Sequence, residues 1–209
     1  MGSPRRSRRR GWYANPPACW LAASRPGQLL YHPYISEAGE RGPFVNANAR
    51  AGFVGLSVVH RYPDLVRAVI EGLGLAMRDC YAAMGELPSE LRLSGGAARS
   101  QGLRRILAAA THAAVRVSAR QEAGAAGAAM MAAVAIRAYP TMDACVADWV
   151  TPLLGRQEAP DPALGAAYDR IYPAFLEARR GLVEAWDALA TARRANAECQ
   201  AHAAEEQAQ

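Results

Sequence analysis

The chain has 209 residues, which is enough for one domain with a substantial hydrophobic core. Its formal net charge of +5 comes from the arginines within residues 5–10, because subtracting those five leaves residues 11–209 formally neutral. A neutral body excludes a broad basic surface for nucleic acid. The sequence contains no lysine, which excludes a Walker-type phosphate loop, and no apolar run approaches the length of a membrane span.

The cysteines and the start of the chain predict a cytoplasmic protein. No two cysteines form a C-x-x-C pair and no histidine stands at metal-ligand spacing. We therefore expect isolated thiols at Cys19, Cys80, Cys145 and Cys199. The arginines of residues 5–10 are not followed by a continuous apolar stretch, so we expect no secretion signal.

The sequence begins with a tail and then becomes strand-like. Residues 1–28 have the composition of an irregular tail outside the fold, with arginines first and paired prolines later. Residues 29–34 are predicted to be extended, and residues 37–44 form a loop punctuated by glycine and proline. Residues 53–58 are a candidate buried strand or turn.

The strongest periodicity predicts a helix over residues 63–84. Pro63 suits the first turn, where its missing N–H costs nothing, and Gly85 stands where a C-terminal cap belongs. Apolar side chains recur at three- and four-residue spacing, at Leu65, Val66, Val69, Ile70, Leu73, Met77, Cys80, Tyr81 and Met84. Glu71 and Asp79 on this helix are expected to be solvated or to act as caps.

Strands and helices alternate after this helix, which favours an α/β layer with parallel strands over a helical bundle. The predicted elements are a strand over 90–94, a helix to about His112, a strand over 115–118, and helices over 122–138, 141–149 and 162–190. Gly124, Gly127 and the alanines around them allow the helix over 122–138 to pack closely against a sheet or a nucleotide. The Ala- and Glu-rich remainder is expected to be a fraying helix or disordered.

The glycine pair Gly95-Gly96 lies between a predicted strand and a predicted helix. Glycine there permits unusual dihedral angles and lets a ligand approach the main chain, while the free N–H groups of the following helix face the same place. A nucleotide pocket is one interpretation. A tight turn without a ligand is the alternative, and the pair alone does not decide between them.

Several segments occur together in one order. They are Gly39-Glu40-Arg41-Gly42-Pro43-Phe44, Asn46 to Arg50, Gly55-Leu56-Ser57, residues 65–74 continuing to Arg78-Asp79, Leu93 to Ser100, and Glu122 to Ala132. Together they resemble the C-terminal lobe of the FGGY carbohydrate kinases, which belong to the actin-like ATPase superfamily. The resemblance covers roughly residues 29–190. Within the family, the stretch from Tyr31 to Arg41 is most similar to erythritol-type polyol kinases.

The resemblance implies an α/β fold: a partial actin-like ATPase (ribonuclease H-like) C-terminal lobe, lacking its first strands, with a helical C-terminal extension. It leaves residues 1–28 and 191–209 as tails. It also implies an ATP site, in which Gly95, Gly96 and Ala97 border the adenosine and phosphates and the Ser100 side chain lies against adenine. The family's intact enzymes use ATP and Mg²⁺ to phosphorylate a hydroxyl of a sugar or polyol.

The resemblance also implies that essential parts are missing. The family needs an aspartate base, Mg²⁺ held by carboxylates, and phosphate loops from both lobes, and its catalytic aspartate precedes the segment that matches Gly39–Phe44. The first aspartate of this sequence is Asp64. We therefore expect no catalytic residue in this chain, an inactive fragment, and a strand over residues 90–94 with an unpaired apolar edge. Such a chain is expected to be poorly soluble or partly molten.

Two further functions are open from the sequence. One is a non-catalytic nucleotide-binding or regulatory half-lobe that a partner chain completes. The other is nucleic-acid binding by the arginines of residues 5–10, although a misplaced translation start accounts for those residues equally well. The sequence also leaves a homo-oligomer open. The histidines are expected to be ordinary polar positions: His32, His60, His112 and His202. Trp149 and Trp186 are expected in a core or an interface.

Overall fold

The computed structural model describes residues 24–207, so most of the expected N-terminal tail lies outside the described part. Two short strands form an antiparallel pair, β1 (Leu30–His32) and β2 (Gly52–Val54), in which Tyr31 faces Phe53. The extended segment predicted over 29–34 is confirmed around β1. The segment predicted as a buried strand or turn over 53–58 is a strand to Val54 and a turn at residues 58–59, and its Phe53 is 39% exposed rather than buried.

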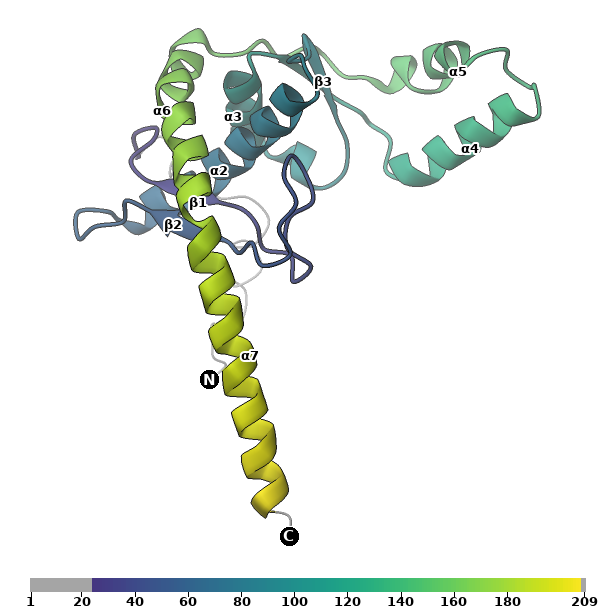
Figure 1. Ribbon diagram of the computed structural model, residues 1–209. Coiled ribbons are helices and arrows are strands. Elements are labelled where there is room, and N and C mark those ends of the chain that lie inside the picture. The colour runs from purple at the N-terminus through teal and green to yellow at the C-terminus, as the bar shows by residue number, and fades with distance from the viewer. Residues whose placement is uncertain (1–23, 208–209) are drawn as a thin grey trace, which may run out of the picture.

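Helix α2 (Tyr62–Ala83) agrees with the predicted helix. Pro63 lies in its first turn, and the Asp64 carboxylate accepts a hydrogen bond from the backbone N–H of Arg61. Gly85 has a φ of +110° just after the helix end, a conformation that favours glycine. The helix packs against β1 on one face and α3 (Gln101–Thr111) on another, which places it in the centre of the molecule (Figure 1).

Strands β3 (Glu90–Leu93) and β4 (Ala114–Val117) are parallel, with Leu91 facing Val115, and α3 connects them. This confirms the predicted parallel arrangement. The segment 154–158 runs along the other edge of β4, where antiparallel bridges join Val115 to Glu158 and Ser118 to Leu154. Within residues 24–207, β3 has no strand on its outer edge.

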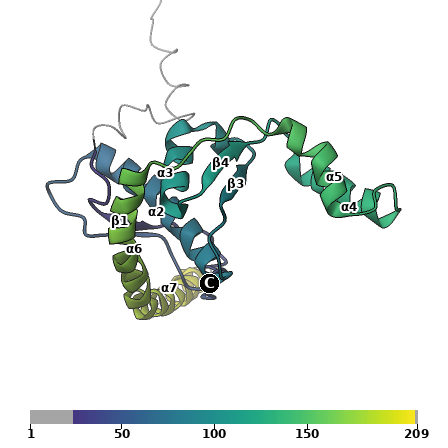
Figure 2. The same ribbon diagram turned by 90° about the horizontal axis from the view of Figure 1, so that it is seen from above.

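The main core lies between α2, α3 and α6 (Pro162–Gly181). Tyr168 and Phe175 of α6 are fully buried there, beside Ile106 of α3. A smaller cluster lies under the parallel strands, and Leu91 and Val115 belong to it. Seen from above, the three helices and the strands form one body (Figure 2).

Helices α4 (Ala123–Ala135) and α5 (Met142–Trp149) form an arm that projects from this body (Figure 2). Within residues 24–207 neither glycine of α4 packs closely against another element, because a Cβ added at Gly124 or Gly127 would meet nothing within 4 Å. The helix is apolar along its length, yet only Met130 is buried. Apolar helices are normally covered, so the exposed face of α4 is available for another element.

Helix α7 (Val183–Gln207) projects from the body as a single rod (Figure 1). The predicted helix over 162–190 is thus two consecutive helices, and the remainder expected to fray or be disordered is helical to residue 207. Trp186 is buried against the body, whereas residues 191–201 are exposed. None of the helices in the described part of the chain is long and apolar enough to span a membrane.

Candidate nucleotide site

The glycine pair lies at the carboxyl end of β3, where the chain enters a short 3-10 helix, η1 (Ala97–Arg99), and then α3. Gly95 has a φ of +82°, a conformation that residues with a side chain rarely adopt. A Cβ added at Gly95 or Gly96 would meet nothing within 4 Å, so the space beside both residues is open. Ligands of parallel α/β sheets bind at this edge.

Ser100 has a local structural role. Its hydroxyl accepts a hydrogen bond from the backbone N–H of Leu103 at 3.3 Å, which caps the N-terminus of α3. Arg104 holds the loop before it, because its guanidinium donates to the carbonyl of Ala98 at 2.8 Å and to the carboxylate of Glu158 at 2.9 Å. The hydrogen bonds of Arg104 and Ser100 therefore hold the turn in place, while the space beside Gly95 and Gly96 stays open.

The end of β4 contributes a second part of the same edge. The backbone N–H of Ser118 donates to the carbonyl of Leu93 at 2.8 Å, and the Ser118 hydroxyl accepts from the N–H of Arg120 at 3.2 Å. The Arg120 guanidinium donates to the carbonyl of Trp149, which ties the base of the α4–α5 arm to this edge. Residues 118–120 are not among the predicted site residues, although the second predicted parallel strand ends at Ser118 and its carboxyl end could have located them.

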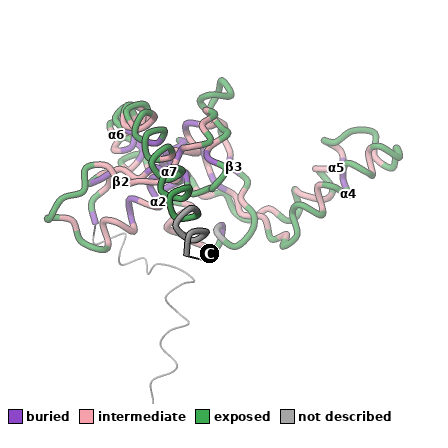
Figure 3. Tube along the Cα trace, turned by 60° about the horizontal axis from the view of Figure 1, so that its bottom comes forward, coloured by how far each residue is buried: buried purple, intermediate pink, exposed green. Residues whose placement is uncertain are grey.

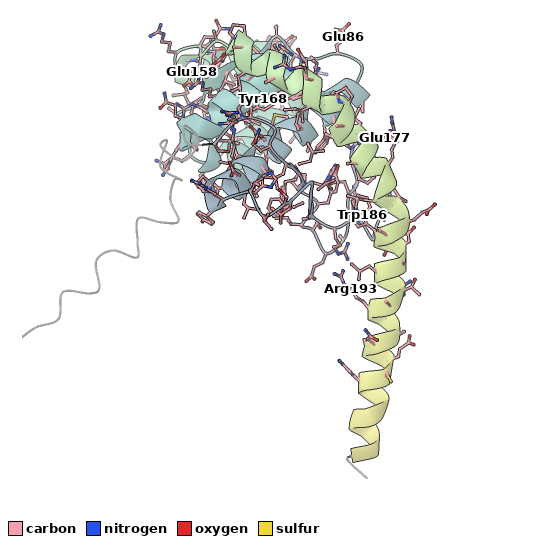
Figure 4. All side chains as sticks on the ribbon, turned by 90° about the vertical axis from the view of Figure 1, so that its left-hand side faces the viewer. Glu86, Glu158, Tyr168, Glu177, Trp186 and Arg193 are labelled. Carbon is pink, nitrogen blue, oxygen red and sulfur yellow. The ribbon has the colours of Figure 1, made fainter. Side chains whose placement is uncertain are left out.

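Glu71 is buried and forms the centre of a polar network, which makes the expectation of a solvated or capping role wrong. Its Oε1 accepts from Arg67 Nε at 2.6 Å and from the Tyr168 hydroxyl at 3.0 Å, and its Oε2 accepts from the N–H of Gly27 at 3.0 Å. Figure 4 shows Tyr168 on the part of α6 that lies against the body. The network joins α2, α6 and the segment before β1, and it gives Glu71 a structural role.

Asp79 is also buried, and it binds Arg179 of α6 and the Tyr172 hydroxyl. Burial raises the pKa of Asp79, although the Arg179 guanidinium opposes that shift. Arg179 lies over the Phe44 ring, 4.8 Å from its centroid, and the Trp186 ring stacks on Phe44 with 6.2 Å between centroids. These contacts fix the loop over residues 37–44 to the junction of α6 and α7.

His32 is fully buried rather than an ordinary polar position. Its ring stacks on Phe175 at 4.4 Å between centroids, and its Nε2 forms a hydrogen bond of 3.0 Å with the Phe175 carbonyl. Burial lowers the pKa of His32, and the positive charge of Arg179 lowers it further, although the hydrogen bond to Phe175 opposes the shift. Among the side chains that the structure describes, no group of three or more could hold a metal ion.

The two parallel strands, the glycine turn and the covering helices define an α/β domain whose open glycine turn lies at the carboxyl edge of its sheet. The model of the "FGGY family of carbohydrate kinases, C-terminal domain" matches residues 17–136, more than half of the chain. The chain therefore belongs to the FGGY family of carbohydrate kinases.

Relatives and solved structures agree with this assignment. The chain is 69% identical over 172 residues to an erythritol kinase of Brucella abortus. The aligned stretch covers 82% of this chain and 33% of that kinase. A ligand-bound xylulose kinase of Lactobacillus acidophilus superposes with a TM-score of 0.72 at 25% identity, over 82% of this chain and 35% of that one. A xylulose kinase of Rhodospirillum rubrum superposes with a TM-score of 0.65 at 30% identity. That superposition covers 81% of this chain and 34% of the xylulose kinase.

These comparisons confirm the family, the actin-like ATPase fold and the similarity to erythritol-type kinases that the motifs predicted. The chain spans about a third of the length of the relatives it matches. The match at residue 17 also begins inside the tail expected over residues 1–28. Residues 24–28 of that tail lie against the fold, where Gly27 binds Glu71.

Proposed function

We propose that this chain is the C-terminal, nucleotide-binding part of an ATP-dependent carbohydrate kinase that transfers a phosphoryl group to a hydroxyl of a sugar or polyol. The observation that carries the proposal is the open glycine turn at the carboxyl end of β3, in a chain of this family. Gly95, Gly96 and Ala97 would border the adenosine and phosphates, and Ser100 would position the turn through its cap on α3. The identity to an erythritol kinase makes a small polyol the first substrate to test.

The chemistry would come from ATP and Mg²⁺ together with residues outside this chain. Phosphoryl transfer needs a base for the acceptor hydroxyl and a metal ion on the phosphates. The family's base is expected in the portion of the relatives that this chain does not span, and the chain by itself would be inactive. The open edge of β3 and the exposed face of α4 are surfaces that such a portion would cover.

Titration calorimetry with ATP tests the nucleotide site directly. We expect the chain to bind ATP and the Gly96→Leu variant to lose that binding, because a leucine side chain would fill the open space beside the turn. Gly124→Leu is the matched control, since Gly124 is equally open but lies on the α4–α5 arm. Absence of ATP binding by the parent chain, or unchanged binding by Gly96→Leu, would contradict the proposed site.

The alternative function is a non-catalytic nucleotide-binding or regulatory half-lobe that a partner completes. Mixing the chain with the N-terminal two thirds of an erythritol kinase separates the two functions. Erythritol-dependent formation of ADP in the mixture supports the kinase part. ATP binding without any such activity favours the regulatory alternative.

A further inference from the structure

The segment between β2 and α2 displays apolar side chains on a turn that is held in place. Leu56 is 55% exposed, Val58 is 101% exposed and Val59 is 76% exposed, and Tyr62 at the start of α2 is 59% exposed. Figure 3 colours most of this stretch as exposed. We call residues 56–62 the apolar turn. An apolar group of this kind on a protein surface marks a place where another element docks.

The apolar turn is fixed by its own hydrogen bonds. Gly55 before it has a φ of +87°, and His60 Nδ1 accepts from the backbone N–H of Ser57 at 2.9 Å. His60 Nε2 forms a further hydrogen bond of 3.1 Å with the carbonyl of Gln28. The backbone that carries the apolar side chains is therefore held in place, which lowers the entropic cost of binding a partner.

The N-terminal part of the chain arrives beside this turn. Ser24 is buried, its hydroxyl donates to Asp64, and its carbonyl accepts from Arg67 Nη1 at 2.9 Å. Both partners belong to the first two turns of α2, which follow the apolar turn directly. Ser24, the first residue that the structure describes, therefore lies at the N-terminal end of α2.

The sequence before Ser24 has the composition of a segment that docks on an apolar surface. Residues 17–23 include Trp20 and Leu21, and no charged residue occurs among them. Trp20 precedes Ser24 by four residues, so their Cα atoms lie within about 14 Å of one another. The family model begins its match at residue 17, which places these residues inside the family's domain.

We propose that residues 17–23 dock on the apolar turn, with Trp20 and Leu21 as the anchoring side chains. The domain then begins near residue 17, and the tail is limited to the arginine-rich residues before it. A large aromatic anchor beside aliphatic side chains and a tyrosine is the composition typical of an energetically important contact. The docked segment would also cover the N-terminal end of α2.

Fluorine NMR of the full chain labelled with 5-fluorotryptophan tests this contact. The chain has four tryptophans, and replacing each one by Phe assigns its signal. We expect the Trp20 signal of the native chain to be displaced from its position in urea. The double variant Val59→Ser/Tyr62→Ser should return it to that position. The Trp149 and Trp186 signals should stay in place, which shows that the body remains folded.

Val45→Ser is the matched control, because Val45 is 84% exposed on a different loop and its replacement should leave the Trp20 signal unchanged. A Trp20 signal at its urea position in the native chain overturns the proposal. So does a signal that the double variant leaves displaced. If the Trp20 signal returns to its urea position on dilution, a second copy of the chain covers the apolar turn in place of residues 17–23 of the same chain. That outcome also overturns the proposal.

Discussion

Removing the Tyr168 hydroxyl tests the buried network that joins α2 to α6. Tyr168 is fully buried, and its hydroxyl donates to Oε1 of Glu71 at 3.0 Å, the oxygen that also accepts from Arg67. Burial raises the pKa of Tyr168, so the hydroxyl keeps its proton and remains a donor. A hydrogen bond to a charged group contributes about 1.5–3 kcal/mol, so Tyr168→Phe should lower the local stability by about 2 kcal/mol.

Amide hydrogen exchange in the middle of α2 and α6 is the assay, because it reports the free energy of local opening even where global unfolding is not cooperative. A loss of about 2 kcal/mol makes exchange about 30-fold faster. Tyr172→Phe is the control, since its hydroxyl lies 3.4 Å from Asp79 Oδ1 in a half-buried position. We expect an acceleration of less than about 5-fold there. Equal acceleration in both variants would refute the role assigned to Glu71.

Further outcomes are expected at Gly72 and Gly74, at His32 and at Ser100. Gly72→Ala should lower the free energy of unfolding by about 3 kcal/mol, the upper end of the usual cost of overpacking, because the new Cβ would lie 2.1 Å from the Tyr31 carbonyl oxygen. Gly74→Ala should be nearly neutral, because the atoms nearest its new Cβ lie 3.1 Å or more away and alanine favours the helix by about 1 kcal/mol. The urea midpoints of the two variants measure the difference. A lower midpoint for Gly74→Ala than for Gly72→Ala would contradict the packing of α2 against β1. Because burial lowers the pKa of His32 in the folded chain, the unfolded chain binds this proton more readily as the pH falls below 6.5, and the stability should fall with it, by at most about 1.4 kcal/mol per pH unit. His32→Phe should flatten that slope between pH 6.5 and 5, and parallel slopes would argue against it. Ser100→Ala should destabilise α3 by about 1 kcal/mol through loss of its cap, measured by exchange of the first amides of that helix, and unchanged exchange would remove the capping role.

Local signals in the sequence predicted the elements that position the candidate site. The helix α2 follows from apolar residues at helical spacing with Pro63 at its start, and the turn after β3 follows from Gly95-Gly96 between a strand and a helix. Both depend on residues near one another in the chain, where dihedral preferences and periodicity act. The order of the motifs along the chain indicated the family, and the family resemblance indicated the location of the ATP site that is proposed at that turn.

Only the tertiary structure decided the roles of the polar residues on α2. When the helix is considered alone, Glu71 and Asp79 are expected to be solvated, because the pair that Glu71 makes with Arg67 at i,i+4 spacing also forms on solvated helix faces. The partners that hold these carboxylates in the core are far away in the sequence, with Tyr168 97 residues from Glu71 and Arg179 100 residues from Asp79. Burial of a carboxylate is tolerated only where such partners converge, and convergence is a property of the packed helices.

At the open glycine turn, too, the sequence determined one property and the tertiary structure decided another. The sequence determined that the backbone could adopt a positive φ at Gly95, because glycine has no Cβ to prevent it. The structure decided that the space beside Gly95 and Gly96 stays open, since Arg104 holds the loop from behind by bonds to Ala98 and Glu158. It also decided that the apolar helix α4 lies outside the body, because nothing in residues 24–207 packs against Gly124 or Gly127.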